Sequence, residues 1–374
     1  MASNLTQVTR DLVDRAWRSA IGYGSPLFTR MLERKQVVEG GTTFTQLYES
    51  SDDQSLVQEY GPNDGLTGGS KEFIKKPTWG RAYLACPMEI DVDTEVMNKP
   101  KGDAQLLDIA SKKATRALKA LKLQMMHRQY GCATDNEIDT QHTYMQGLIS
   151  ALLEDTTYGT LARTTTAHPE WQSADEDNWD TATPLNKTNI DGWLDSCMEF
   201  AEERGEFLIV MGDTLWNRLK AIFEASHTYQ PKASKAVQGF ESMEYSGVEI
   251  AKDYLLDRMV YTGSTNNQGS VAIGHNGSKT YGEYTSEYAG LTGDSTYAGT
   301  QYVFVLDLRT WHLQYSFRNS EQSSRAGDSM FVVTDYFDQS QVKGGKEEML
   351  AHTKFRGNLI CSMPNRNLMR GNVS

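Results

Sequence analysis

The chain has 374 residues, of which 39% are hydrophobic and 23% are charged, and its formal net charge is −12. These fractions are typical of a soluble globular protein and exclude a predominantly disordered chain. No apolar run approaches the roughly 18–20 residues that a membrane-spanning helix needs, so no membrane partner is predicted. The N-terminus has charged residues where a signal peptide has its apolar stretch, and export by that route is not predicted.

The charges are unevenly distributed along the chain. Residues 154–206 contain thirteen acidic and three basic residues. Residues 112–128 contain no acidic residue and six basic ones, which are Lys112, Lys113, Arg116, Lys119, Lys122 and Arg128. Either both segments are solvated faces, or each presents its charge to a different partner.

The cysteines are far apart and match neither a zinc site nor a redox motif. They are Cys86, Cys132, Cys197 and Cys361. We therefore expect buried, reduced thiols in a protein that folds in a reducing cytoplasm.

The first ninety residues predict two arms. Residues 1–40 predict an N-terminal arm of two short helices, broken at residues 22–26, which contain glycine and proline. Residues 41–93 predict a two-stranded arm, because β-prone runs at 42–60 and 73–92 flank a glycine-rich tip at about 61–74. A straight limb of nineteen residues spans about 60 Å at ~3.3 Å per residue. This exceeds the roughly 21 Å radius of gyration of a compact chain of this length.

We predict that the two-stranded arm lies across another molecule. Its apolar residues would be exposed on an isolated ribbon, which is only marginally stable in water. These residues are Phe44, Leu47, Tyr48, Phe73, Ile74, Trp79 and Tyr83.

A long amphipathic helix is predicted over residues 103–130, because apolar residues recur there at spacings of three and four and Gly131 follows as a stop signal. Downstream, a helix, a buried strand and a second helix are predicted at 189–204, 207–211 and 213–225. Further strands are predicted at 248–251, 259–262, 302–308, 312–317 and 330–337. Residues 263–300 are rich in Gly, Ser, Thr and Tyr and show no helical period.

No catalytic constellation, cofactor motif or metal site is predicted. Residues 274–280, GHNGSKT, are similar to a phosphate-binding loop, but Ser278 separates the glycine from the lysine and no helical pattern follows. The seven histidines are never paired at metal-ligand spacing. Adjacent acidic residues such as Glu202 and Glu203 are expected on solvated faces.

The order of these segments resembles the major capsid protein family of tailed bacteriophages, which has the Hong Kong 97-like fold. Residues 44–92 are similar to the extended loop of that family, and residues 103–130 to its spine helix. Residues 188–222 are similar to its axial domain, in which a helix precedes a strand and a second helix. The ending FRGNLICSMPNRN, residues 355–367, is similar to the G-N-L-x-C…N-R close of several members.

This resemblance implies an α+β fold in five parts. They are an N-terminal arm (1–40), an extended loop (41–93), a peripheral domain with the spine helix (94–145), an axial domain (146–317), and peripheral return strands with a C-terminal tail (318–374). Residues 263–300 have no counterpart in the family and are expected to be an insertion in the axial domain.

The resemblance also implies a structural role without catalysis or cofactor. Members assemble in the host cytoplasm as pentamers and hexamers, forming the icosahedral shell of a virion around double-stranded DNA. The expected partners are copies of the chain, non-specifically bound DNA, a separate scaffolding protein, a portal and decoration proteins. Two alternatives stay open: an encapsulin-like shell that holds protein cargo, and a carbohydrate- or nucleotide-active enzyme.

Two segments hold the candidate site residues. Contacts between subunits are expected at the loop tip, through Gly61, Gly65, Gly68, Gly69, Lys71, Lys75 and Lys76. The six basic residues of 112–128 are expected to face DNA phosphates, which carry no sequence information. Some relatives also join a loop lysine covalently to an asparagine of a neighbour, and here Asn358, Asn365 and Asn367 are the candidate asparagines. Solvation of the tip lysines is the alternative.

Overall fold

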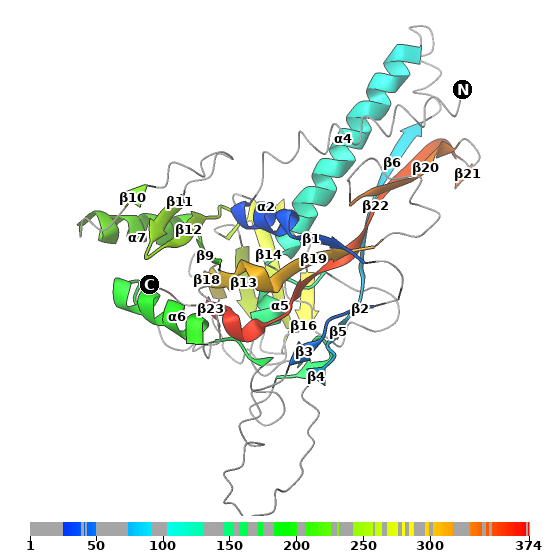
Figure 1. Ribbon diagram of the computed structural model, residues 1–374. Coiled ribbons are helices and arrows are strands. Elements are labelled where there is room, and N and C mark those ends of the chain that lie inside the picture. The colour runs from blue at the N-terminus through cyan, green and yellow to red at the C-terminus, as the bar shows by residue number, and fades with distance from the viewer. Residues whose placement is uncertain are drawn as a thin grey trace, which may run out of the picture.

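Two six-stranded β-sheets organise the structure (Figure 1). The computed structural model describes residues 25–38, 41, 43–49, 74–91, 103–130, 145–152, 157–163, 171–174, 183–199, 206–225, 230–231, 242–256, 259–263, 268–275, 279–280, 284–287, 296–298, 302–316, 330–338, 342–343, 346–371 and 373. Statements below about what is absent concern these residues.

The first sheet, called the β9 sheet below, contains two adjacent strands, β9 and β18, whose residues are all buried. Its order is β10 (Gln230–Pro231), β11 (Ser242–Tyr245), β12 (Val248–Lys252), β9 (Phe207–Met211), β18 (Val303–Asp307) and β23 (Leu368–Arg370). Helices α6 (Lys187–Glu199) and α7 (Asp213–Ala225) contribute Trp193 and Phe223 to the core against it. A strand buried on both faces reads as a continuous apolar run, which is why FLIVM is recognisable in the sequence.

The second sheet, called the β22 sheet, forms a helix-on-sheet layer. Its order is β1 (Lys35–Val37), β19 (Trp311–Tyr315), β22 (Lys346–Cys361) and β20 (Val332–Asp338), and β6 (Ala82–Asp91) and β21 (Val342–Lys343) also pair with β22. Helix α4 (Asp103–Arg128) packs against β6 and β22, and this layer projects from the body (Figure 1). The predicted long helix is confirmed, and its apolar residues Ala114, Leu118, Leu121 and Met125 are buried.

Helix α2 (Pro26–Glu33) is attached to α4 and to the β9 sheet by a buried polar cluster. The Ser25 hydroxyl caps α2 by accepting from the Phe28 N–H at 3.3 Å, and it donates to the Asp253 carboxylate next to β12. The Tyr130 hydroxyl donates to Asp253 Oδ2 at 2.6 Å, and Gln129 Nε2 donates to Ser25 Oγ at 2.8 Å. Burial, and then the Asp253 charge, raises the pKa of Tyr130 well above its usual value, so the hydroxyl stays protonated and remains a donor.

Two ion pairs continue this contact along α2. Arg30 Nη2 lies 3.0 Å from Glu249 Oε2, and Arg34 pairs with Glu206. Partly exposed pairs contribute at most about 1 kcal/mol each. The buried cluster around Asp253 therefore carries more of the attachment. The first of the two helices predicted for the N-terminal arm lies outside the described residues.

Much of the predicted insertion at 263–300 is a third sheet. Strands β13 (Met259–Gly263), β14 (Gln268–His275), β15 (Lys279–Thr280), β16 (Tyr284–Glu287) and β17 (Thr296–Ala298) pair antiparallel. The strand predicted at 259–262 is its first member. The β-prone Thr and Tyr residues of this segment are consistent with that structure.

The chain crosses between the β9 and β22 sheets three times, and the last two crossings are short. After β18 ends at Asp307, the short helix η8 (Leu308–Thr310) leads into β19 of the other sheet. After β22, the helix η10 (Pro364–Arg366) leads back to β23, which pairs with β18. The predicted boundary at 317/318 thus separates β18 from β23, which pair in the β9 sheet, and β19 from β22, which pair in the other sheet. Hydrophobic periodicity identifies a strand but not its partner.

Asp253→Ala is expected to lower the free energy of unfolding by about 2–4 kcal/mol, because the buried hydroxyls of Ser25 and Tyr130 lose their acceptor. Urea denaturation followed by circular dichroism measures this loss. Asp191→Ala is the matched control, since it removes the acceptor of Tyr245 at the exposed surface, where the two oxygens lie 3.0 Å apart. The control should cost less than about 0.5 kcal/mol, and equal losses in the two variants would contradict the assigned role of Asp253.

Candidate assembly interface

The base of the predicted two-stranded arm is a ribbon of two short antiparallel ladders. Strand β2 (Phe44–Thr45) pairs with β5 (Thr78–Trp79), and β3 (Tyr48–Glu49) pairs with β4 (Ile74–Lys75). The second limb does not continue to residue 92 as predicted, because β6 leaves the ribbon and pairs with β22. The backbone hydrogen bonds of β6 are thus made within the β22 sheet. Among the described residues the ribbon covers only 44–49 and 74–79, so the predicted straight reach of about 60 Å is not seen in them.

An aromatic cluster buries the inner face of the ribbon against its own chain. Phe44, Tyr48 and Trp79 are buried, although the sequence predicts that they would be exposed on an isolated ribbon. The Tyr48 and Trp171 ring centroids lie 4.5 Å apart, and those of Trp79 and Tyr158 lie 5.6 Å apart in an edge-to-face arrangement. Aromatic pairs of this kind contribute about 0.5–1.5 kcal/mol beyond the burial of their surface. The base of the ribbon is therefore fixed, which the sequence does not indicate.

The turn between β7 (Thr157–Tyr158) and β8 (Leu161–Ala162) closes this cluster. Gly159 has a φ of +60°, and a Cβ there would lie 2.8 Å from the Trp79 ring, so glycine is required at this position. The buried guanidinium of Arg163 donates to the carbonyls of Ser150 and Ala151 in helix α5 (Leu148–Leu152), and it lies 5.3 Å from the Tyr158 ring centroid. The cluster is thereby joined to the molecular core.

The outer face of the ribbon is exposed. The side chain of Leu47 is 74% exposed and that of Ile74 is 46% exposed, although both are aliphatic. Lys76 is exposed beside them, while Lys75 is half-buried opposite Tyr48. The remaining tip candidates, Gly61, Gly65, Gly68, Gly69 and Lys71, lie outside the described residues. Single exposed aliphatic side chains are common on protein surfaces, so these two mark only the face of the ribbon that its own chain leaves uncovered.

The basic residues of α4 do not share one face. Lys112, Arg116 and Lys119 are exposed on successive turns of the helix, on the side away from the β22 sheet, and Lys113 and Arg128 are half-buried. Lys122 is buried, with 3% of its surface exposed, because it follows Leu118 and Leu121 on the side of the helix that packs. Burial lowers the pKa of Lys122 to about 8. The prediction that Lys122 belongs to a DNA-facing surface is therefore corrected.

The side chain of Asn367 forms hydrogen bonds with both of the short crossings between the sheets. Its side-chain oxygen accepts from the Asp307 N–H at 2.9 Å and from Trp311 Nε1 at 2.8 Å. Its amide nitrogen donates to Thr310 Oγ1 at 2.9 Å and to the Met363 carbonyl at 2.8 Å. These partners flank η8 and η10, so one fully buried amide holds both connections.

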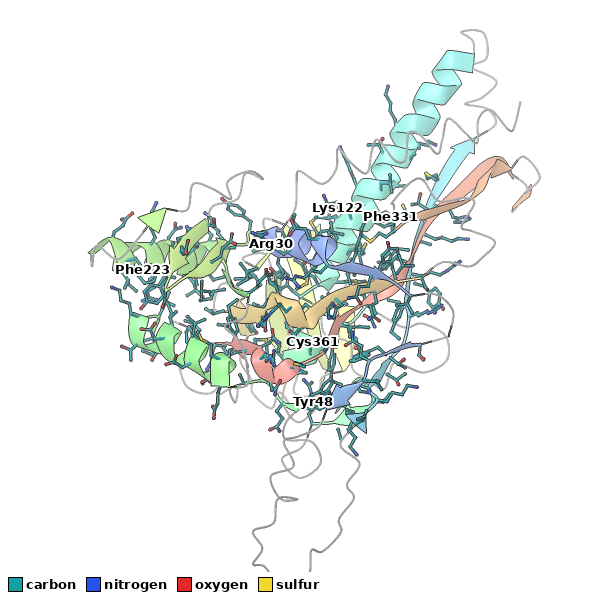
Figure 2. All side chains as sticks on the ribbon, viewed as in Figure 1. Arg30, Tyr48, Lys122, Phe223, Phe331 and Cys361 are labelled. Carbon is teal, nitrogen blue, oxygen red and sulfur yellow. The ribbon has the colours of Figure 1, made fainter. Side chains whose placement is uncertain are left out.

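The residues of the G-N-L-x-C close have packing and hydrogen-bonding roles within the subunit. A Cβ on Gly357 would lie 2.5 Å from the Gln314 carbonyl oxygen, so this position of β22 requires glycine. Asn358 accepts from the Gln146 N–H at 2.8 Å and donates to the Gly80 carbonyl at 2.9 Å. The backbone N–H of Cys361 donates to the Tyr158 hydroxyl at 2.8 Å, and burial raises the pKa of its thiol to about 12. Figure 2 labels Cys361 at this junction and Tyr48 at the ribbon.

The asparagines proposed for a covalent cross-link are mostly unsuitable. Asn358 and Asn367 are fully buried and hydrogen-bonded through both side-chain atoms, so a lysine of a neighbour has no access to them. Asn365 is half-buried and remains the single candidate of the three. Of the cysteines, Cys197 and Cys361 are buried thiols as expected, Cys86 is a half-buried thiol, and Cys132 lies outside the described residues.

The described residues contain no cluster of three His, Cys, Asp or Glu side chains that could hold a metal ion. The phosphate-loop reading of residues 274–280 is not supported by the backbone, because β14 and β15 form a hairpin there in which His275 pairs with Lys279. A membrane-spanning helix is likewise not found within the described part of the chain.

Comparison with known proteins identifies the fold. No family model and no curated protein matches the sequence. Among solved structures, a chain of the cyanophage A-1(L) capsid asymmetric unit is 12% identical, with a TM-score of 0.61 over 94% of this chain and 93% of that one. More distant are the SrpI encapsulin of Synechococcus elongatus PCC 7942 (9% identity, TM-score 0.47, 92% and 88% covered) and the putative capsid protein of an Escherichia coli CFT073 prophage (10%, 0.45, 95% and 95%). The chain thus has the phage-capsid fold, an α+β fold, as predicted from the resemblance.

Asn367→Ala is expected to cost about 3 kcal/mol of unfolding free energy, because the Asp307 N–H and the Trp311 indole lose their acceptor inside the core. Chemical denaturation followed by tryptophan fluorescence measures it. Asn365→Ala, two residues away in a half-buried site, is the control and should change stability by less than about 0.5 kcal/mol. A loss of that small size for Asn367→Ala would show that the junction does not depend on its amide.

Lys122→Met is expected to remove a pH dependence of stability. Since the folded pKa of about 8 lies below the usual 10.5, the unfolded chain binds more protons between these pH values, and wild-type stability rises with pH through that window. The variant should lose this rise and exceed the wild type in stability at pH 7. Urea midpoints at pH 7 and pH 10 test this, with the exposed Lys119→Met as control. Parallel profiles for wild type and Lys122→Met would refute it.

Proposed function

We propose that the protein is the major capsid protein of a tailed bacteriophage, which assembles as pentamers and hexamers into an icosahedral shell around double-stranded DNA. The observation that carries the proposal is a capsid fold over nearly the whole chain, together with a ribbon that is anchored on one face and exposed on the other. The role is structural rather than catalytic, and the site of action is the virion.

The ribbon supports assembly through its two different faces. Its inner face is fixed by Trp79 and Tyr48, so the direction in which the loop leaves the subunit is set before assembly. Its outer face presents Leu47 and Ile74, whose burial against a neighbour stabilises association by roughly 1–2 kcal/mol each when complete. Rings such as pentamers and hexamers are built from repeated contacts between unlike surfaces, which close when the rotation between neighbours closes. The glycine-rich tip then adapts to unequal neighbours in pentamers and hexamers.

The exposed face of α4 is proposed as the DNA-facing surface. Lys112, Arg116 and Lys119 lie on successive turns there, and such side chains contact phosphates without reading sequence. A separate scaffolding protein, a portal and decoration proteins are the further partners that this role implies, with assembly in the host cytoplasm.

Deletion of residues 61–70 is expected to abolish particle formation while the subunit stays folded. The subunit should stay folded because the aromatic anchor and the ladders at 44–49 and 74–79 lie outside the deletion. Electron microscopy and sedimentation of the purified protein count particles, and circular dichroism reports the fold. A control that replaces 61–70 by ten Gly and Ser residues keeps the loop length and should retain more assembly than the deletion. Normal particles from the deletion would refute the role of the tip.

A further inference from the structure

Strand β1 is held to the rest of the β22 sheet along one edge only (Figure 1). It pairs parallel with β19, with Gln36 opposite Gln314, and no other described strand pairs with it. The Val38 N–H donates to the Tyr315 carbonyl at 2.9 Å and extends this pairing by one bond. Val37 is 46% exposed, so the strand gains little from burial of its side chains. Side-chain hydrogen bonds to β19 therefore carry a substantial share of the attachment of β1.

His312 of β19 makes one of these contacts through a ring nitrogen. Gln36 Nε2 lies 3.2 Å from His312 Nδ1, and Gln314 Nε2 donates to Gln36 Oε1 at 3.4 Å. Because an amide nitrogen can only donate, Nδ1 is the acceptor, and the imidazole is neutral with its proton on Nε2. The three side chains thus form a chain of hydrogen bonds that joins the edge strand to β19.

Protonation of His312 removes the acceptor at the end of this chain, since both nitrogens of the charged ring are donors. Gln36 can turn its oxygen toward the ring only if Gln314 turns as well, because two amide nitrogens would otherwise face each other. Gln314 is 5% exposed and lies opposite Asn358, whose oxygen already accepts from two backbone N–H groups. The turn would replace the buried amide oxygen of Gln314 by two N–H donors, and buried N–H groups without an acceptor are rare in proteins.

The surroundings of His312 also favour its neutral form. Burial above all, and then the charge of Arg34, lowers the pKa of His312 below its usual value. Its opposite residue on β22, Ile360, is apolar. The charged side chains on the elements next to it are Arg30 and Glu33 of α2, Arg34 and Lys35 at β1, Glu206 before β9, Arg309 of η8 and Arg356 of β22. Both carboxylates among them are already paired with arginines. Protonation therefore adds a positive charge to a positive neighbourhood.

We propose that His312 is a proton-controlled contact, which holds β1 against β19 when it is neutral and releases this edge strand when it is protonated. Helix α2 stays attached in both states, because the buried cluster around Asp253 fixes its other end. The released strand leads from α2 toward the ribbon, which begins at Phe44. Acidification thus loosens the connection between these two parts. The contact lies inside one subunit, so the inference does not depend on the proposed function.

The direction of the pH dependence follows from proton linkage. When β1 is released, His312 is exposed and returns toward the ordinary histidine pKa of about 6.5. The released state then binds more protons than the attached state, so a fall in pH through this range favours release and a rise restores attachment. The usual pKa of a carboxyl group is about 4, so a comparison of pH 8 with pH 5.5 leaves ordinary carboxylates ionised.

Hydrogen exchange of the purified, unassembled subunit tests the proposal. Protection factors correct for the intrinsic exchange rate at each pH. Those of the 35–38 amides that bond to β19, Val38 among them, should fall about three- to tenfold from pH 8 to pH 5.5. The amides of residues 29–33 in α2 are the internal reference and should keep their protection. His312→Gln keeps an acceptor for Gln36 but does not titrate, so its protection should be equal at the two pH values.

Gln36→Glu should reverse the dependence. A carboxylate at this position accepts from the protonated ring and attracts its charge, so the protection of residues 35–38 should rise from pH 8 to pH 5.5. His352→Gln, at a half-buried position of β22, is the matched control and should keep the wild-type fall. Circular dichroism confirms that each variant is folded, and Gln36→Glu decides alone if His312→Gln does not fold.

Three outcomes would overturn the inference. They are equal protection of residues 35–38 at both pH values in the wild type, a wild-type fall that persists in His312→Gln or in Gln36→Glu, and a fall of the same size at residues 29–33. The last result would show general loosening rather than release of β1. None of these measurements requires a shell, so a failure of the proposed function is seen separately, as the absence of particles.

Discussion

The structure depends on a single buried amide at the point where the chain passes between its two sheets. Asn367 accepts from two donors and donates to one acceptor on the connection at 307–311, and it donates to the Met363 carbonyl on the other connection. Neither connection can therefore move without breaking hydrogen bonds to this amide. A buried polar network that makes only some of its hydrogen bonds is less stable than an apolar core in the same place. The relative orientation of the β9 and β22 sheets is therefore fixed by an all-or-none arrangement rather than by a flexible linker.

From this junction a continuous set of contacts leads to the surface. Cys361, beside Asn367, donates through its backbone to the Tyr158 hydroxyl, and the Tyr158 ring packs against Trp79 at the base of the ribbon. Asn358 holds Gly80, where the chain passes from the ribbon into β6. The ribbon and the projecting layer thus leave the junction in fixed directions.

The sequence predicts the elements better than their partners. The α4 stripe and the apolar strand β9 follow from local periodicity and are confirmed, and the order of segments was enough to indicate the fold. The sequence does not indicate that β19 pairs in the β22 sheet or that β23 pairs in the β9 sheet, because pairing between distant segments leaves no local signal. Burial of Lys122 and of Phe44 was missed for a related reason: it depends on what packs against a face. The G-N-L-x-C close shows only a likeness at the level of sequence, and the contacts of Gly357 and Asn358 explain it.

Cryo-electron microscopy of the particles formed by the purified protein can test whether the two sheets keep one relative orientation in every subunit. The account predicts a closed shell in which subunits from pentamers and hexamers superpose over both sheets, with the Asn367 hydrogen bonds intact, and differ in the course of the loop at 50–73. A shell whose subunits differ by rotation of one sheet against the other at 308–310 and 362–367 would contradict the fixed junction. A small oligomer under all assembly conditions would contradict the function as well.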